Sequence, residues 1–255
     1  MKAIWTGSIG FGLVNIPIKM YSAVEESTLD LDMLDKKNHA RIRFKRVNEN
    51  TGKEVAWENI VRGYLENERY VVLDEKDFQK ASPEKTKHIE ITQFVDEKEI
   101  DSIFFEMPYY LEPEKTGVRA YVLLREALKK SSKAGIGVFV MHKREHVGMI
   151  KATDDVLVLN RIRFAEEIRS HKDLNLPSAK SKPGELKMAM NLIDQLTTKF
   201  DPSEYKDEYT SKLLKIIKAK AKGKSVPFHP LKVVHSPTKD LMEQLKASLS
   251  KKRAS

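Results

Sequence analysis

Two histidines and a glutamate stand close together in the sequence, in the order His142, Glu145, His146. On a helix, this HxxEH pattern supplies two zinc ligands and a general base, the equipment of a metal-dependent hydrolase or nuclease. Here it lies between two apolar runs, 138–141 and 147–150, which are typical of β-strands, so we expect a hairpin turn. Because a turn does not present both histidines from one helical face, we expect no metal or other cofactor here. A metal-dependent hydrolase or nuclease that uses these residues is the alternative interpretation.

Other signatures of catalysis or nucleotide binding fail on context. Gly223-Lys224-Ser225 resembles the end of a phosphate-binding loop, but Lys218 occupies the position where the first glycine of that loop is required. The chain has no cysteine, which excludes disulfides, thiolate catalysis and cysteine-based zinc sites. We therefore expect a protein that is not an enzyme.

Basic residues suggest a different chemistry, the binding of phosphates. In residues 39–45, Arg41, Arg43 and Lys45 alternate with Ala40, Ile42 and Phe44, so a strand would carry the three cations on one face. Same-face residues lie about 6.6–6.8 Å apart, which matches alternate phosphates of one DNA strand at about 3.4 Å spacing. An edge strand protected by its charges is the alternative interpretation. Further candidate contacts are Arg46, Lys53 and Arg62, close by in the sequence, and Lys143 and Arg144 in the predicted hairpin turn.

The end of the chain is strongly basic. Residues 1–170 hold 28 Lys/Arg and 28 Asp/Glu, whereas residues 171–255 hold 18 and 9, so the whole net charge of +9 lies in the last third. Such asymmetry points to a tail that binds nucleic acid or an anionic membrane. No bulky aromatic face accompanies the charge, which favours DNA over a membrane. The candidate contacts are Lys215, Lys218, Lys220 and Lys222, at the end of a predicted helix.

The elements that carry these residues are mostly short strands. Period-two alternation separated by polar turns extends over most of residues 5–164, including a turn at 48–53 in which Gly52 can take a positive φ. Helices are predicted only over 75–81 and 118–131 within this region. Many short strands with one central helix favour a mixed β/α fold with a mainly antiparallel β-barrel core.

From residue 185 onward the apolar period becomes helical. One predicted helix carries the stripe Leu186, Ala189, Met190, Ile193, Leu196 and Phe200. Asp201 followed by Pro202 predicts the start of a second helix, and Gly223 predicts its end. A last amphipathic helix, 239–249, presents Leu241, Met242, Leu245 and Leu249 as a candidate partner-binding stripe. The Pro-, Ser- and Lys-rich stretch 175–184 is the expected boundary, which gives domains of 1–175 and 185–255.

The length of 255 residues is consistent with one or two domains. No apolar run approaches the 18 or so residues that a membrane span needs, and the first residues lack the apolar core of a signal peptide. We therefore expect a cytoplasmic protein.

Several segments resemble bacterial Ku proteins. The opening Trp5-Thr6-Gly7-Ser8-Ile9-Gly10-Phe11-Gly12-Leu13-Val14-Asn15-Ile16-Pro17 is similar to the signature at the start of that family. The similarity continues in collinear order through Ile60–Tyr64, Pro108–Pro113, Leu159–Phe164 and Asp240–Leu249.

The resemblance implies a homodimer whose β-barrel cores and arching strands close a ring around the ends of double-stranded DNA. It also implies a role in DNA double-strand break repair by non-homologous end joining, with recruitment of the ATP-dependent DNA ligase D, and association with the nucleoid. By position, the arch is residues about 30–73, and the helical, lysine-rich region 185–255 serves ligase recruitment and DNA contact. Many relatives carry a CxxC pair where this chain has Asn48 and Thr51, so a metal or redox role of that pair is absent here. A protein adaptor with incidental DNA binding is a further alternative.

Overall fold

The computed structural model describes residues 1–25, 27–81, 87–178, 180–224 and 241–251. The chain divides into two compact units, one of residues 1–26 and 30–170 and the other of residues 27–29 and 171–255. None of the helices in the described ranges is long and apolar enough to cross a membrane.

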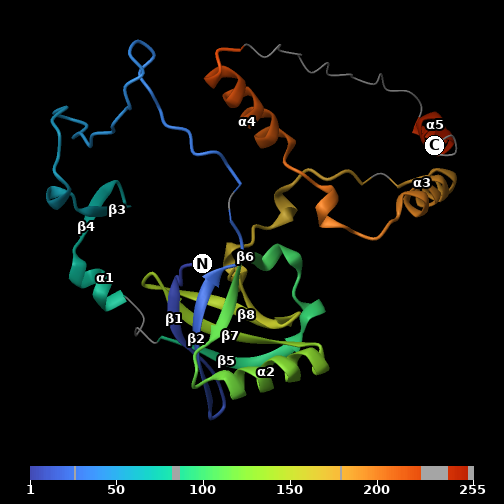
Figure 1. Cartoon of the computed structure of the whole chain (residues 1–255), viewed down its shortest axis with the longest axis horizontal. Coiled ribbons are helices and arrows are strands. Elements are labelled where there is room, and N and C mark those ends of the chain that lie inside the picture. The colour runs from blue at the N-terminus through green and yellow to red at the C-terminus, as the bar shows by residue number, and fades with distance from the viewer. Residues whose placement is uncertain (26, 82–86, 179, 225–240, 252–255) are drawn as a thin grey trace. The chain divides into compact units, whose positions relative to one another are not determined.

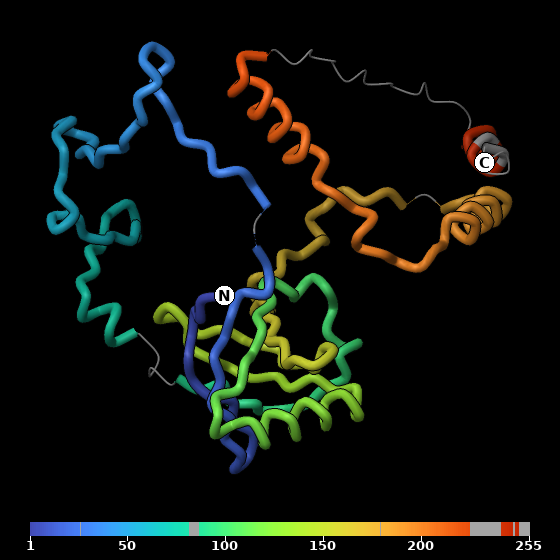
Figure 2. Tube along the Cα trace, in the orientation of Figure 1, coloured from blue at the N-terminus to red at the C-terminus, as the bar shows by residue number. Residues whose placement is uncertain are grey.

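A closed barrel of seven strands forms the core of the first unit (Figure 1). Its order is β1-β2-β6-β9-β8-β7-β5, and every neighbouring pair is antiparallel except β1 and β5, which are parallel. The mainly antiparallel β-barrel predicted from the alternation is thereby confirmed. The path of the chain through the barrel can be followed in Figure 2. The strands are β1 (Trp5–Phe11), β2 (Val14–Ser22), β5 (His88–Asp96), β6 (Phe105–Pro113), β7 (Lys133–Met141), β8 (Arg144–Thr153) and β9 (Val156–Ile162).

Alternation decides which side chains fill the barrel. In β2, Ile16, Ile18 and Met20 are fully buried, whereas Asn15 and Lys19 point outward. Glycine permits the closest approach of two strands, because a Cβ on Gly137 of β7 would lie 2.4 Å from the backbone oxygen of Glu90. The interior is therefore a packed core of apolar side chains.

Helix α2 (Val118–Ser131) packs against β2, β7 and β8, with the bounds that the sequence predicted (Figure 1). Its residues Tyr121, Leu124 and Leu128 are buried in the same core as the strands. The Tyr121 hydroxyl donates to the backbone oxygen of Leu111 at 2.7 Å and accepts from the backbone nitrogen of Leu157 at 2.7 Å. This one oxygen thus joins the helix to both β6 and β9.

We expect the substitution Tyr121→Phe to destabilise the barrel by about 1–3 kcal/mol, because it leaves a buried backbone N–H and carbonyl without their partner. The measurement is denaturant unfolding followed by circular dichroism. Tyr110→Phe, which removes an exposed hydroxyl, serves as the control and should change the unfolding free energy by less than about 0.5 kcal/mol. Equal stability of the Tyr121→Phe variant and the parent would contradict this role.

Between β2 and β5 the chain forms the arch segment, residues 30–73, and then α1 (Glu75–Ala81), whose bounds also match the prediction. The only regular sheet described in the arch segment is a hairpin of β3 (Arg62–Glu66) and β4 (Arg69–Leu73). All five residues of β3 are exposed. The hairpin therefore has no covered face within the described part of one chain.

The second unit contains α3 (Pro183–Leu196), α4 (Glu208–Ala221) and α5 (Leu241–Lys251), and α5 packs against α3. The predicted start of α4 at Asp201 is wrong. Residues 202–204 form only a short 3-10 turn, and Asp207 caps α4 by accepting from the backbone nitrogen of Thr210. Gly223, with a φ of 69°, follows the end of α4 as predicted.

Two further details of the helical predictions differ from the structure. Phe200 lies beyond the end of α3, so it does not extend the apolar stripe of that helix. The predicted first residues of the last helix, 239 and 240, lie outside the described residues.

Candidate nucleic-acid interface

Two short loops in the arch segment are each closed by backbone pairing between their ends, and we call each of them a clip. In the first, the backbone nitrogen of Asp35 donates to the carbonyl of Ala40 at 2.8 Å, and Leu34 and Arg41 form an isolated bridge. In the second, Val47 and Glu54 form a bridge around the predicted turn. Each clip fixes the direction of the chain without a hydrophobic core.

The turn of the second clip confirms the expectation for residues 48–53. The side-chain oxygen of Asn48 accepts from the backbone nitrogens of Asn50 and Thr51, both at 3.0 Å. Gly52 has a φ of 63°, the left-handed conformation that glycine adopts without strain. Local hydrogen bonds therefore close the turn where many relatives were expected to carry a CxxC pair.

The continuous strand expected over residues 39–46 is wrong. Apart from the bridge at Arg41, residues 39–46 form no ladder, and His39 has a φ of 57°. The apolar partners in the alternation are not buried, because Phe44 is 80% exposed. No sheet or core lies against this stretch in the described chain, and the alternation alone could not reveal this. The even spacing of the cations is therefore not imposed by a strand.

Two of the predicted phosphate contacts are engaged in ion pairs. Arg41 Nη2 lies 2.5 Å from Asp32 Oδ1, and Lys45 Nζ lies 2.7 Å from Glu54 Oε2. Both pairs are well exposed, so they exchange partners at little cost in stability. In the absence of a ligand, their charge is nevertheless neutralised locally.

Two other arginines stack on aromatic rings. The guanidinium carbon of Arg46 lies 4.6 Å from the centre of the Trp57 ring, and that of Arg62 lies 5.3 Å from the Phe78 ring. Stacking leaves the N–H groups at the edge of the guanidinium available to an oxyanion. Trp57, which is 67% exposed, was not singled out from the sequence, although tryptophan is usually well buried.

Among the predicted phosphate contacts of the arch segment, Arg43 and Lys53 are the two without a described side-chain partner. Their side chains make no hydrogen bond or ion pair with any other described residue. Among the predicted contacts in this segment, these two and the stacked Arg46 and Arg62 are therefore the best placed to meet phosphates.

The HxxEH residues lie on the hairpin formed by β7 and β8. His142 and Lys143, with φ values of 53° and 67°, form its tight turn, and Glu145 and His146 belong to β8, so the pattern is not on a helix. Within the described ranges, no group of three His, Asp or Glu side chains is placed to hold a metal ion. The geometry does not favour the metal-dependent hydrolase.

Lys143, a predicted phosphate contact, binds a carboxylate instead. Its ammonium lies 2.9 Å from Glu75 Oε1 at the start of α1, and this contact lowers the pKa of the Glu75 carboxyl. The neighbouring Arg144 has no described partner for its side chain.

His146 is half-buried on β8, directly opposite Phe139 of β7, and the two ring centres lie 5.5 Å apart. Burial, together with the nearby Arg161 guanidinium, lowers the pKa of the imidazole. Arg161 itself forms a two-pronged ion pair with Glu106, at 2.8 and 2.6 Å, which lowers the pKa of that carboxyl. His146 is thus a half-buried side chain whose surroundings disfavour its protonation.

The lowered pKa predicts how stability depends on pH. Below about pH 6.5 this histidine binds a proton more readily in the unfolded chain than in the folded barrel. The free energy of unfolding therefore decreases as the pH falls through the lower pKa of the folded state. We expect His146→Gln to reduce this loss between pH 7.5 and pH 5.5. Denaturant unfolding at the two pH values measures it, with His171→Gln in an exposed turn as the control. An unchanged pH dependence in the His146→Gln variant would contradict the assignment.

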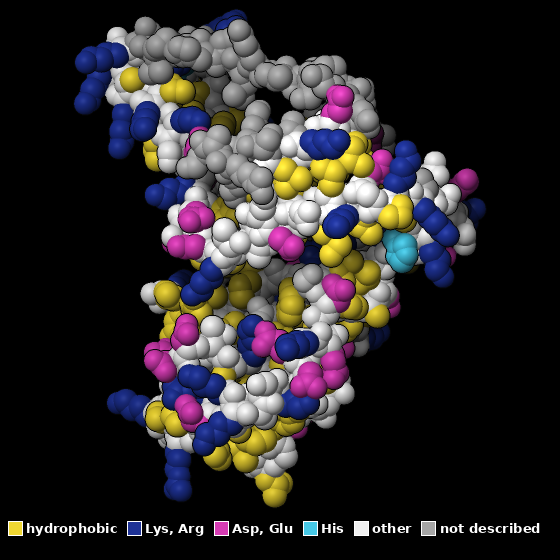
Figure 3. Space-filling view, turned by 90° about the vertical axis from the view of Figure 1, so that its right-hand side faces the viewer, with side chains coloured by type: hydrophobic (Ala, Val, Ile, Leu, Met, Phe, Trp, Pro, Cys, Tyr) yellow, Lys and Arg dark blue, Asp and Glu magenta, His cyan; other side chains and the backbone are white. Residues whose placement is uncertain are grey.

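The predicted tail contacts lie at the end of α4. Lys215, Lys218, Lys220 and Lys222 are all exposed. Lys218 and Lys220 belong to the last turn, where positive charge also complements the partial negative charge of the helix end. On the face seen in Figure 3, basic and acidic side chains alternate with exposed hydrophobic ones.

The predicted partner-binding stripe of α5 is partly covered. Met242, Leu245 and Leu249 are half-buried, whereas Leu241 is 54% exposed. Met242 lies beside Gly184 at the start of α3. The two helices form a small assembly in which the larger exposed apolar surface belongs to α3, where Leu186, Met190, Ile193 and Leu196 are each more than half exposed.

Comparison with known proteins finds a matching family over most of the chain. Residues 10–189 match the Ku70/Ku80 beta-barrel domain family, Ku. The chain is similar to the Non-homologous end joining protein Ku of Coxiella burnetii, with 38% identity over 98% of this chain and 95% of that protein. It is 40% identical to the protein of the same name from Pseudomonas aeruginosa, over 86% of this chain and 77% of that protein. The corresponding protein of Archaeoglobus fulgidus is 37% identical, over 98% of both chains.

Proposed function

Because the chain belongs to the Ku family, we propose that it binds the ends of double-stranded DNA in non-homologous end joining, as a homodimer that encircles the duplex. The observation that carries this proposal is the arch segment, an extension with exposed arginine, lysine and apolar side chains and without a core of its own, inserted between strands β2 and β5 of a Ku barrel. The protein would act as a clamp and not as an enzyme.

The exposed apolar side chains of the arch segment support dimer formation. Phe44, Trp57 and Tyr70 are 80%, 67% and 74% exposed, and the β3–β4 hairpin has no covered face within the described chain. A two-stranded sheet is only marginally stable alone, and an apolar surface of this kind normally packs against a partner. A second copy of the chain supplies such a surface to both arches at once.

The proposed mechanism is electrostatic. Lysine and arginine side chains neutralise phosphates and release counterions, a contribution that does not depend on the base sequence. Arg43, Arg46, Lys53 and Arg62 of the arch segment are the principal contacts, with Arg41 and Lys45 joining after they exchange their carboxylate partners. Arg144 of the barrel and the lysines of α4 are further contacts, and Lys143 becomes one only if it leaves Glu75.

The helical region 185–255 is proposed to recruit the ATP-dependent DNA ligase D. Its support is an exposed apolar face on α3 and the α5 stripe, both within a unit separate from the barrel. DNA binding would also place the protein at the nucleoid.

A mobility assay with linear, nicked circular and closed circular duplex across a salt series tests the ring. We expect the protein to load on linear duplex and to stay trapped at high salt when the ends are then ligated, because a closed ring has no other exit. Weak, salt-sensitive binding alone is expected on closed circles. Equal, salt-resistant binding to closed circles would overturn the ring.

A further inference from the structure

The outer surface of the barrel carries a groove that the proposed DNA clamp does not use. It consists of two adjoining cavities, of about 510 and 340 Å³, which share the residues Tyr110, Glu112 and Val156. We call these two cavities the outer groove. They lie where strands β2, β6 and β9 meet α2.

The aromatic side chains of Tyr110 on β6 and Tyr21 on β2 form the floor of the outer groove, and alternation along β6 determines the direction of Tyr110. Tyr109 and Leu111 are buried in the core, so Tyr110 and Glu112 point outward, about 6.6–6.8 Å apart. Tyr110 is also directly opposite Tyr21 on β2, so two phenol rings lie on adjacent strands. An exposed aromatic pair of this kind can accept a cation over a ring face.

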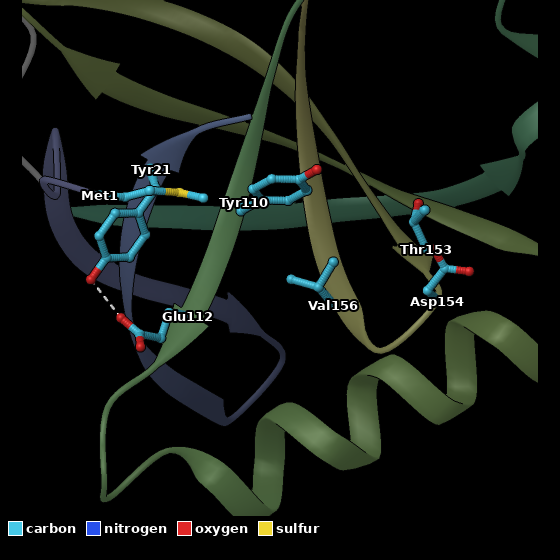
Figure 4. Close-up of a pocket in the computed structure, with 7 residues that line it drawn as sticks. All are labelled: Met1, Tyr21, Tyr110, Glu112, Thr153, Asp154 and Val156. Atoms are coloured by element: carbon cyan, nitrogen blue, oxygen red, sulfur yellow. Dashed lines mark hydrogen bonds between the residues drawn. The ribbon is translucent and has the colours of Figure 1, made fainter. Parts of the chain in front are cut away.

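Carboxylates stand on both sides of this floor (Figure 4). Glu112 accepts a hydrogen bond from the Tyr21 hydroxyl, which raises the pKa of that phenol. The Asp154 carboxylate, in the turn between β8 and β9, has no hydrogen bond or ion pair with any other described residue. No Lys, Arg or His side chain is among the described residues that line the larger cavity.

The two cationic side chains of α2 beside the groove are already committed, and Met1 also lines the larger cavity. Lys129 donates to the backbone oxygen of Asp154 at 3.2 Å, and Arg125 donates to the backbone oxygen of Asp155 at 2.8 Å. Both side chains come from α2 and bind carbonyls of the turn, not the carboxylate of Asp154. An aromatic and acidic groove disfavours a phosphate backbone and favours a cation.

The second cavity adds an apolar end to the groove. It is lined by Pro113 and by Val122 of α2, which is 40% exposed. An occupant that places a cation over Tyr110 would therefore place its neighbouring residues against aliphatic side chains.

We propose that the outer groove is a docking site for a segment of a partner protein that carries a lysine or arginine next to an aliphatic residue. The cation lies over Tyr110, between Glu112 and Asp154, and the aliphatic residue packs against Val122 and Pro113. None of the described residues that line the groove is among the residues proposed to contact DNA.

Fluorescence anisotropy with short labelled peptides tests the proposal on the full-length chain. The probe peptide contains one lysine followed by two valines, flanked by glycine and serine, and the comparison peptides replace lysine with norleucine or glutamate. We expect lysine to bind about 5- to 30-fold more tightly than norleucine, and glutamate to bind more weakly than both. The advantage of lysine should shrink in about 0.5 M salt.

Two variants locate the binding in the outer groove. Tyr110→Leu and Glu112→Gln should each lower the affinity for the lysine peptide at least about threefold while leaving DNA-end binding unchanged. Tyr70→Leu, at an exposed tyrosine of the arch segment, is the control and should leave peptide binding unchanged. Thermal unfolding verifies that each variant is folded.

Equal affinity for the lysine and norleucine peptides, or no saturable binding of either, would overturn the proposal. Because DNA binding is measured on the same samples, a failure of the DNA clamp is recorded separately from a failure of the groove.

Discussion

Replacing Arg43, Arg46, Lys53 and Arg62 together with glutamine is expected to weaken the binding of DNA ends by about 10³-fold at physiological salt. A homodimer loses eight exposed cations, and at about 0.5 kcal/mol for each phosphate contact the total corresponds to roughly three powers of ten in Kd. The logarithmic salt dependence should flatten by about 0.9 for each phosphate that the variant no longer neutralises. Equilibrium titrations of a labelled duplex across a salt series measure both quantities.

The choice of these four residues follows from their surroundings in the arch segment. Arg43 and Lys53 have no described side-chain partner, and Arg46 and Arg62 stack on rings that leave their N–H groups available. Arg41 and Lys45 already face Asp32 and Glu54, so the double variant Arg41→Gln, Lys45→Gln should cost less affinity than a double variant of Arg43 and Lys53.

A matched variant separates specific contacts from net charge. Replacing Lys98, Lys115, Arg119 and Lys130, all exposed and all in the barrel unit, removes the same charge. We expect its affinity to stay within about threefold of the parent. Equal losses in the two quadruple variants would show that only net charge attracts DNA, and the arch segment would no longer be the interface.

The barrel was predictable because its strands follow a period that packing enforces. In β2 and β6, each outward residue alternates with one that fills the core, so the sequence shows the pattern that the structure needs. The bounds of the helix at 118–131 were predictable from its apolar period. Its buried face was predicted only in part, because Leu123, expected in the apolar stripe, is 62% exposed, whereas Tyr121, which was not expected there, is buried beside Leu124 and Leu128.

The arch segment was predictable in its turn at 48–53 and in the extended run that forms β4. Asn48 and Gly52 determine a turn through local hydrogen bonds and a positive φ, which need no distant contact. The alternation at 39–46 has no such local cause, and without a neighbouring strand or a core it does not produce a ladder. Ion pairs such as that of Lys45 with Glu54 depend on the fold of the clip and were not visible in the spacing.

The outer groove was not predictable from any motif. Tyr21 and Tyr110 are far apart in the sequence, and only the pairing of β2 with β6 brings them opposite each other. The same holds for Asp154, whose sequence surroundings indicate a solvated turn. It lies in such a turn, but at the edge of a cavity that the sequence does not reveal.

Removing residues 171–255 is expected to abolish the stimulation of ligase D while leaving a protein that still binds DNA ends. These residues belong to a compact unit other than the barrel, so their removal does not cut the strands that close the barrel. The variant also loses the lysines of α4. Because Lys218 and Lys220 complement the helix end, we count about two further phosphate contacts per subunit, and we expect affinity to fall by about 10- to 30-fold.

Ligation assays must therefore be run at a protein concentration that restores full occupancy of the ends. The comparison variant replaces Lys215, Lys218, Lys220 and Lys222 with glutamine and keeps α3 and α5 intact. We expect it to show the same loss of affinity as the truncated chain but full stimulation of the ligase at saturation. If the truncated chain still stimulated the ligase at saturation, the barrel and not the helical region would recruit it. If the lysine variant lost stimulation as well, the charge of α4 rather than the apolar surface of α3 and α5 would be the recruiting feature.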